Sequence, residues 1–194
     1  MSSNLPNEKL CLEILREEGC SDKVVRHVCM VNTVAMFIAK ACNADLDLVN
    51  AGSWLHDVGR SRTHGPRHVS EGVTIARSRD LPEALVRVIS RHIAAGFTPE
   101  EAEMLGLPQG DYMPVTLEEK IVCHADNLVK DDRIMTLDEA LEELEVRGYT
   151  TTTKRMVVMH QELSMIAGGD LDLMIDDTEL RKKASKRCAA YTSH

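Results

Sequence analysis

A histidine and an aspartate stand side by side at the end of a short apolar run. The run covers residues 51–55, and His56 and Asp57 follow it directly. Imidazole nitrogens and carboxylate oxygens are common ligands of divalent metal ions in proteins. Turn chemistry before Gly59 is the ordinary alternative, because aspartate often hydrogen-bonds to nearby backbone at such positions. The pair alone therefore leaves two interpretations open: a plain helix end, or part of a metal site.

Three further side chains of the same types fall on apolar helix faces elsewhere in the chain. His27 and His92 lie on the hydrophobic stripes of two predicted helices, and Asp126 lies on that of a third. A buried, unpaired carboxylate is costly, and a cation or a metal is its usual partner. Taken singly, each histidine is more often a packed core residue, and Asp126 could pair with Arg133. Together with the adjacent histidine and aspartate, the three favour a shared metal site.

The order of these residues along the chain matches a known pattern. This order resembles that of the HD superfamily of metal-dependent phosphohydrolases: it runs from His27 through the pair His56 and Asp57 to Asp126. The segment HDVG is similar to the HD-[IV]-G (HDIG-type) variant of the core motif, and the segments RHIAAG and HADNLV resemble two later motifs of that variant. The bare His–Asp pair is a weak signal, but the ordered set is specific. The resemblance covers about residues 20–130.

The resemblance implies an all-α bundle with its metal site between central helices, and the hydrolysis of a phosphate ester or a related bond. Transferred position by position, the core metal ligands are His27, His56, Asp57 and Asp126. In binuclear members the aspartate of the His–Asp pair bridges two ions. Asp57 is therefore also the expected catalytic residue.

Two more histidines match the additional ligands of binuclear members, and these are His68 and His92. His64 lies four residues before His68, at a spacing that would let both share a helix face. Pro66 stands between them, however, and favours a helix that starts near it, which leaves His64 in the preceding loop. We therefore expect His68 to bind metal and His64 to contact substrate at the rim of the cleft.

Phosphate oxygens also need positively charged partners. Arg60 follows the His–Asp motif closely, and Lys130 lies one helical turn after Asp126, so we expect both to bind substrate. The alternative is that each is a solvated charge on a helix face. Some mononuclear HD nucleotidases carry a glutamate at the position of Arg60. The resemblance therefore does not extend to the deoxynucleotide 5′-phosphatase activity of that branch.

A ligand set of histidine and aspartate without thiolate suits one or two divalent ions, among Mn, Fe, Co, Ni, Zn and Mg. The number of histidines argues against an all-magnesium site, because magnesium prefers oxygen ligands. A bound metal lowers the pKa of its water, so no nucleophilic side chain is required.

The expected function is that of a phosphodiesterase or phosphatase acting on a nucleotide or another small phosphate compound. One alternative is a phosphodiesterase or phosphatase for RNA ends, and a second is a non-catalytic metal-binding sensor module. The retained set of candidate ligands argues against the sensor module. The last alternative is a purely structural helical protein whose histidines are scattered and bind no metal. Measurement of bound metal would distinguish it from the other three interpretations.

Composition and periodicity support an all-α fold. Aromatic residues make up only 3% of the 194 residues, so the core must be mainly aliphatic. Helical patterns follow one another along the chain, and no segment reads as a strong strand. We expect one HD domain over residues 1–170 and a C-terminal helical extension over 171–194, with a charged helix at about 177–190. That helix could pack on the domain or on a second copy, which would make a homodimer.

Charge and cysteine usage narrow the partners and the compartment. The net charge of −8 argues against a long nucleic acid as partner, since such surfaces are basic. The sequence predicts neither a signal peptide nor a membrane span, and therefore no membrane partner. Six cysteines without a CxxC pair predict reduced thiols in a cytoplasmic protein. We take His124 as structural, and place His160 and His194 on the surface.

Overall fold

The predicted all-α class is confirmed. A computed structural model describes residues 4–131, 133–175, 178–189 and 191 as α-helices joined by short connections, with one 3-10 turn and one small hairpin. The elements are α1 Glu8–Glu17, α2 Asp22–Ala41, α3 Leu46–Leu55, η1 Val58–Ser61, α4 His68–Ser78, α5 Glu83–Ser90, α6 Pro99–Met104, α7 Leu117–Asn127, β1 Val129–Lys130, β2 Arg133–Ile134, α8 Leu137–Val146, α9 Thr153–Ala167, α10 Leu171–Ile175 and α11 Thr178–Ala189.

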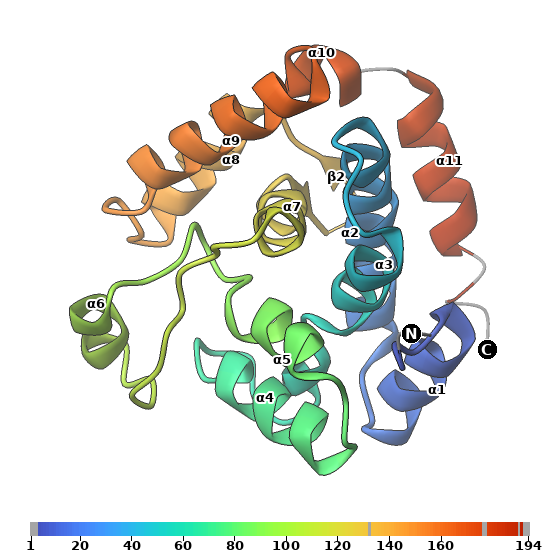
Figure 1. Ribbon diagram of the computed structural model, residues 1–194, viewed down its shortest axis with the longest axis vertical. Coiled ribbons are helices and arrows are strands. Elements are labelled where there is room, and N and C mark those ends of the chain that lie inside the picture. The colour runs from blue at the N-terminus through green and yellow to red at the C-terminus, as the bar shows by residue number, and fades with distance from the viewer. Residues whose placement is uncertain (1–3, 132, 176–177, 190, 192–194) are drawn as a thin grey trace.

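Helix α2 lies at the centre of the fold. Its N-terminus is capped by Ser21, whose side chain accepts a hydrogen bond from the Val24 backbone. Because several of its faces are apolar, α2 packs against α3, α7 and α11 at the same time (Figure 1). Helices α4 and α5 lie on one side of this centre, and α8, α9 and α10 lie on another.

The same helix bears on the predicted absence of a membrane span. By length and composition, α2 is apolar enough to cross a membrane, with a mean hydropathy of 1.3. Within its most apolar window, 61% of the residues are buried inside the protein, as in the core helices of soluble proteins. The absence of a membrane partner stays a prediction.

Two glycines allow the helices around the His–Asp pair to approach one another. A Cβ atom on Gly59 would lie 2.0 Å from the backbone oxygen of His68, and one on Gly72 would lie 2.9 Å from Ile89 Cγ2. Any larger residue would push α4 away from η1 and α5. These contacts place the start of α4 directly beside η1, which is what brings His68 to Asp57.

Several helices end earlier than their apolar periodicity predicts, which would extend three of them to about residues 58, 93 and 130. Helix α3 stops at Leu55 and α5 stops at Ser90, so the residues that follow belong to turns. Helix α7 stops at Asn127, and the chain then forms an antiparallel hairpin in which Val129 pairs with Ile134. The sequence pattern predicts neither this hairpin nor the short helices α6 and α10. Pairs of two-residue strands carry too few residues to show an alternating pattern.

The C-terminal helix packs along α2. Arg187 of α11 donates hydrogen bonds to Asn32 at 2.7 Å and to Glu8 at 2.5 Å, and its guanidinium lies over the ring of Trp54. The division of the chain near residue 170 stays a prediction, as does the homodimer. Part of the predicted extension, including His194, lies outside the described residues.

The cysteines do not all fit the predicted reduced state. The structure pairs Cys29 of α2 with Cys188 of α11, with Cα atoms 5.6 Å apart. The two lie 159 residues apart in the chain, so no local spacing could signal the pair. The remaining cysteines are free, and they are Cys11, Cys20, Cys42 and Cys123. A cytoplasmic location stays a prediction.

Candidate metal centre

All six predicted metal ligands converge on one point, most of them from helix ends. His27 lies near the start of α2, and His68 is the first residue of α4. His56 caps the C-terminus of α3, and Asp57 follows it. The remaining two are His92, which comes just after α5, and Asp126, in the last turn of α7. His92 was expected on the face of α5; the helix ends before it, and the turn aims its ring inward.

Three of the histidines are held in the same way. In His56, His68 and His92, ring atom Nδ1 hydrogen-bonds to the backbone carbonyl three residues earlier, at 2.9, 2.8 and 2.7 Å respectively. A carbonyl only accepts, so each Nδ1 carries the proton. In a neutral ring, the other nitrogen, Nε2, is then left with a lone pair, which is the form in which histidine binds a metal.

These lone pairs point at one another. The Nε2 atoms of His68 and His92 lie 3.0 Å apart, and they lie 3.1 and 3.5 Å from Oδ1 of Asp57. Asp57 is 1% exposed, and Oδ1 has no hydrogen-bond partner. Electron-rich atoms packed together in this way repel one another unless a cation lies between them. The arrangement therefore fits a positively charged ion.

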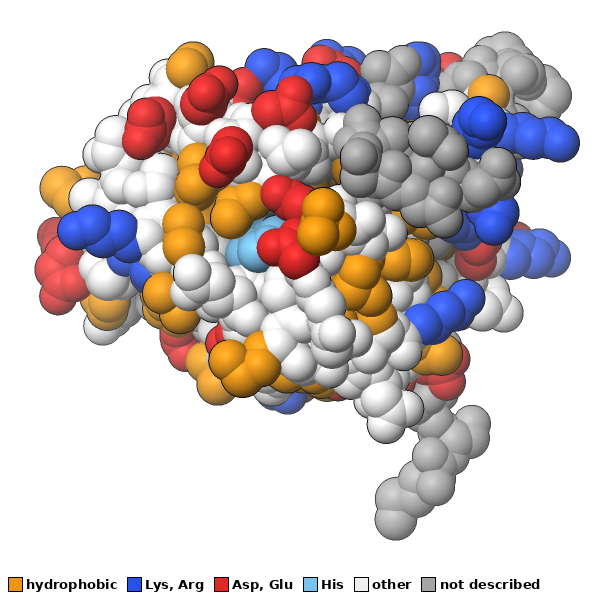
Figure 2. Space-filling model, turned by 90° about the horizontal axis from the view of Figure 1, so that it is seen from above, with side chains coloured by type: hydrophobic (Ala, Val, Ile, Leu, Met, Phe, Trp, Pro, Cys, Tyr) orange, Lys and Arg blue, Asp and Glu red, His pale blue; other side chains and the backbone are white. Residues whose placement is uncertain are grey.

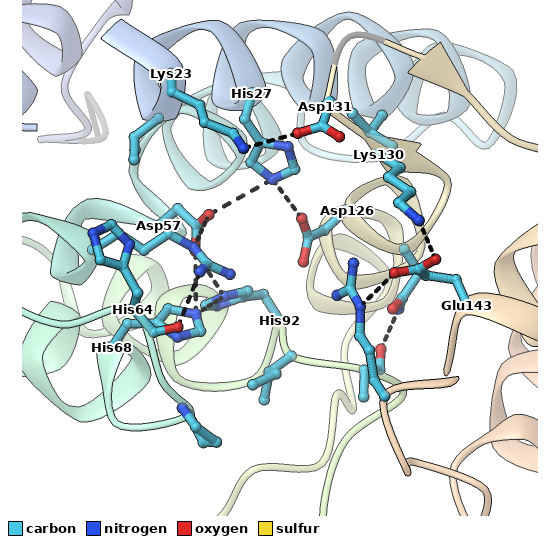
Figure 3. A pocket seen from close by; sticks show the side chains of 18 of the residues that line it. Lys23, His27, Asp57, His64, His68, His92, Asp126, Lys130, Asp131 and Glu143 are labelled. Atoms are coloured by element: carbon cyan, nitrogen blue, oxygen red, sulfur yellow. Dashed lines mark hydrogen bonds and ion pairs between the residues drawn. The ribbon is translucent and has the colours of Figure 1, made fainter. Parts of the chain in front are cut away.

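The other half of the cluster forms around Asp126. His27 Nε2 lies 2.9 Å and His56 Nε2 lies 3.3 Å from Oδ1 of Asp126. The same two nitrogens lie 3.6 and 3.7 Å from Oδ2 of Asp57 (Figure 3). His56 Nε2 is buried without a hydrogen-bond partner, like Oδ1 of Asp57. Asp57 thus faces both halves of the cluster.

The charges of the cluster shift its pKa values. Burial opposes ionisation of Asp57, but the imidazoles around it, above all His56, hold its pKa well below the usual range. Burial likewise opposes protonation of His56, but the negative charges of Asp57 and Asp126 raise its pKa. Burial lowers the pKa of His92, which keeps its ring neutral. Both carboxylates are therefore charged at neutral pH and call for positive counter-charge.

Three overlapping groups of side chains bring their ligand atoms within 4.8 Å of one another. The groups are His27–His56–Asp57, His56–His92–Asp126 and Asp57–His68–His92. Each offers nitrogen and oxygen ligands to a divalent cation. The HD domain family model matches residues 24–131, a span that contains every one of these side chains. The chain belongs to the HD domain family. HD domains bind divalent metal ions, and this cluster is able to hold one.

Archaeal proteins resemble this HD domain in sequence. Proteins named tRNA (cytidine(56)-2′-O)-methyltransferase from Picrophilus torridus and Thermoplasma volcanium are 43% and 39% identical to it over 173 and 168 residues. The matches cover 89% and 87% of this chain but only 51% and 50% of those proteins, so the chain spans about half their length. An uncharacterised protein of Methanocaldococcus jannaschii is 41% identical over 152 residues, which is 75% of this chain and 90% of that protein.

A solved structure shares the fold. The HD domain of the phosphodiesterase PgpH from L. monocytogenes, in complex with cyclic-di-AMP, superposes with a TM-score of 0.53 and 17% identity. The match covers 81% of this chain and 94% of that chain. It confirms the HD-type helical bundle.

Two of the three predicted substrate contacts stand at the metal centre of the HD domain. Arg60 donates from Nε to Oδ2 of Asp57 at 2.5 Å and from Nη1 to the backbone oxygen of His64 at 3.4 Å. Its side chain is 30% exposed, so it faces the cavity while it holds the aspartate. The side chain of His64 is exposed and lines the same cavity, at the rim where the sequence analysis placed it.

The third predicted contact, Lys130, lies farther along the cavity. It belongs to β1, and not to a continued α7 as its spacing suggested. Its ammonium group pairs with the carboxylate of Glu143 on α8 (Figure 3). The spacing from Asp126 placed Lys130 near the metal ligands, and Lys130 does line their cavity. Its ion pair with Glu143 could not be predicted, because α8 comes from a part of the chain that carries no HD motif.

One pair of histidines outside the cluster was assigned only half correctly. His124 is buried, as expected of a structural residue, and its Nε2 lies 3.1 Å from Nδ1 of His160. His160 is 4% exposed, so its predicted place on the surface is wrong. Helix α9 packs against α2, α7, α8 and α10, and these contacts bury one face of it, on which His160 lies. Met156 and Leu163, four residues before and three after His160, would have indicated an inward face.

Other residues that were not predicted from the sequence also line the cavity. Asn127, next to Asp126, hydrogen-bonds to the backbone oxygen of Ala94 and so links α7 to the turn after His92. Its position inside the HADNLV segment was the available signal. Arg147 and Tyr149 also line the cavity, and nothing in their local sequence marks them.

Proposed function

We propose that the chain is a metal-dependent phosphoric ester hydrolase acting on a nucleotide or another small phosphate compound. The observation that carries this proposal is the set of facing lone pairs at Asp57, where two Nε2 atoms approach the same carboxylate oxygen. In an ordinary protein core, buried polar atoms such as these would have hydrogen-bond donors as partners, or apolar side chains would stand in their place. Membership of the HD domain family supplies the reaction class.

The ligands divide into two sets. His27, His56, Asp57 and Asp126 are proposed to hold one ion. A second ion would be held by Asp57, His68 and His92, so Asp57 would belong to both sets, and it is the proposed catalytic aspartate. The hydrogen bonds at Nδ1 support these assignments, because they fix each ring with Nε2 toward the carboxylates.

With an ion held by these residues, a bound water of lowered pKa would be available as the attacking group. The remaining roles fall to the chain itself. Arg60 fixes Oδ2 of Asp57 and presents its guanidinium beside the position of the scissile phosphate. His64 closes the rim on the same side. The histidine count favours Mn, Fe, Co, Ni or Zn over Mg.

A second candidate is a phosphodiesterase or phosphatase for RNA ends. Two relatives that carry this domain within a longer protein are named as tRNA methyltransferases, which favours a role near RNA. The acidic net charge still argues against a long duplex. On the face seen in Figure 2, basic side chains stand among acidic and hydrophobic ones. A short end needs no extended basic surface to enter the cavity.

The test is a substrate screen with a matched pair of variants. Purified chain is incubated with Mn, Ni, Co, Fe or Zn and offered nucleoside phosphates, cyclic dinucleotides, dinucleoside polyphosphates and short RNAs with phosphorylated ends. Hydrolysis is expected in the wild type and in His124→Gln, and is expected to be lost in Asp57→Asn. Hydrolysis of RNA ends alone would favour the second candidate. Inactivity toward all of these with every metal would contradict both.

A further inference from the structure

The cavity at the metal centre continues well beyond the six proposed ligands. It encloses about 960 Å³, and its far wall is built by α8 and the turn after it, including Leu144, Arg147 and Tyr149. Cavities of roughly 300–1,000 Å³ hold ligands the size of a drug molecule. A lone phosphate group at the metal ligands would leave the far wall without a partner. The cavity therefore fits a substrate that reaches from the metal ligands to α8.

Two cations share one carboxylate on this far wall. Arg147 Nε donates to Oε1 of Glu143 at 3.0 Å, and the ammonium group of Lys130 pairs with the other carboxylate oxygen. Figure 3 shows Lys130 and Glu143 on the opposite side of the cavity from His64 and His68. Two positive charges against one negative charge leave this group with a net positive charge. An anion is the ligand that such a wall attracts.

The ion pairs on this wall can be exchanged for contacts with a ligand. The side chains of Lys130 and Arg147 are 45% and 50% exposed, so water screens their pairing with Glu143 and little stability depends on it. A phosphate group offers more acceptor oxygens than a carboxylate, and a guanidinium can bind it with two parallel hydrogen bonds. Tyr149 lines the same wall; burial raises the pKa of its hydroxyl, which stays protonated as a hydrogen-bond donor.

We propose that Lys130, Arg147 and Tyr149 form a subsite for a second phosphate group of the substrate, and that Glu143 holds the two cations when this phosphate is absent. The substrate class is then a nucleotide with two separate phosphate groups, one at the metal ligands and one beside α8. A free bisphosphate nucleotide and a phosphorylated RNA end share this chemistry. The inference rests on the proposed phosphohydrolase function.

The test compares KM for adenosine 3′,5′-bisphosphate with KM for p-nitrophenyl phosphate, which has a single phosphate group. Lys130→Ala and Arg147→Ala are each expected to raise the ratio of the two KM values about 10-fold, since each removes a charge-assisted hydrogen bond. Glu143→Gln is expected to lower the ratio, because the neutral side chain no longer competes. The control variant Arg133→Ala breaks a similar ion pair, in which the side chains of Arg133 and Glu139 lie 2.6 Å apart. Neither residue lines the cavity, so this variant should leave the ratio of the two KM values unchanged.

Calorimetric binding separates this inference from the proposed function. Weaker binding of adenosine 3′,5′-bisphosphate by Lys130→Ala, but not by Arg133→Ala, supports the subsite even if the wild type hydrolyses no phosphate ester. A parallel titration with a 5′-phosphorylated triribonucleotide shows which source of the second phosphate binds more tightly. Failure of the wild type to bind either compound overturns the proposal, as does a KM ratio that is the same in Lys130→Ala, Glu143→Gln and wild type.

Discussion

The protein contains two groups of buried histidines that look alike at first sight. In one, the rings of His68 and His92 have centroids 5.1 Å apart; in the other, the rings of His124 and His160 also have centroids 5.1 Å apart. The first pair lies against Asp57, with Asp126 close by, and opens to a cavity of about 960 Å³. The second pair lies between α7 and α9. Among the described residues, the potential metal groups all belong to the first.

The difference lies in the carboxylates. At the metal centre, the charges of Asp57 and Asp126 raise the pKa of His56 in spite of burial. In the second group, burial and the neighbouring charge of His160 lower the pKa of His124 to about 3, so its ring stays neutral. Proximity of histidines is therefore a poor guide to metal binding. Buried negative charge beside them, with access from solvent, is what distinguishes a site from a packed pair.

The largest expected effect comes from removing one carboxylate from the metal centre. Asp57→Asn, and separately Asp126→Asn, should lower kcat/KM for the best substrate by at least ~100-fold, because loss of an outer partner alone costs up to about that much. His124→Gln should keep activity within about twofold. Initial rates at saturating metal measure both. A drop in His124→Gln as large as in Asp57→Asn would remove the distinction between the two groups.

Metal binding should stabilise the folded protein through the first group of histidines and should not depend on the second. At a metal concentration about 100 times the Kd, binding adds ~2.7 kcal/mol to the free energy of unfolding. For a domain of this size, that corresponds to an increase in Tm of roughly 5–10 °C. Differential scanning fluorimetry with Mn, Co, Ni or Zn should show the increase in wild type and in His124→Gln. An equal increase in Asp57→Asn would mean that the ion binds elsewhere.

His124, in the second group, should contribute to the loss of stability at acidic pH. His124 has a folded pKa of about 3 against 6.5 in the unfolded chain, so only the unfolded chain takes up its proton between these values. Its contribution to stability is present above pH 6.5 and is lost as pH falls toward 3. Between pH 7 and pH 5 this amounts to about 2 kcal/mol. Urea unfolding should therefore show a smaller loss over this range in His124→Gln. An unchanged loss would refute the account of His124.

Much of the metal centre could be predicted from the sequence, because its residues lie on faces that the sequence pattern defines. His27 and Asp126 project from helices with clear apolar stripes, and the order of the motifs supplied His56 and Asp57. The pattern was less reliable near helix ends. His92 and Lys130 both lie beyond the helices to which periodicity assigned them, because a helix stops where tertiary contacts replace its own hydrogen bonds.

The far wall of the cavity could not be predicted in this way. Glu143, Arg147 and Tyr149 follow the hairpin after the last motif, and only the folded chain brings them opposite His64. The pairing of Cys29 with Cys188 was missed for the same reason. Such contacts depend on how α8, α9 and α11 pack around α2 and α7, and short-range patterns carry no information on that packing.

The most direct test of the account is the metal content of the purified chain. Each protein is incubated with Mn, Fe, Co, Ni or Zn, freed of excess metal, and measured by inductively coupled plasma mass spectrometry. The account predicts one or two ions per chain in wild type and in the His124→Gln, His160→Gln double variant. It predicts a loss of bound metal in the Asp57→Asn, Asp126→Asn double variant. Equal metal content in the two double variants, or no metal in the wild type, would contradict it.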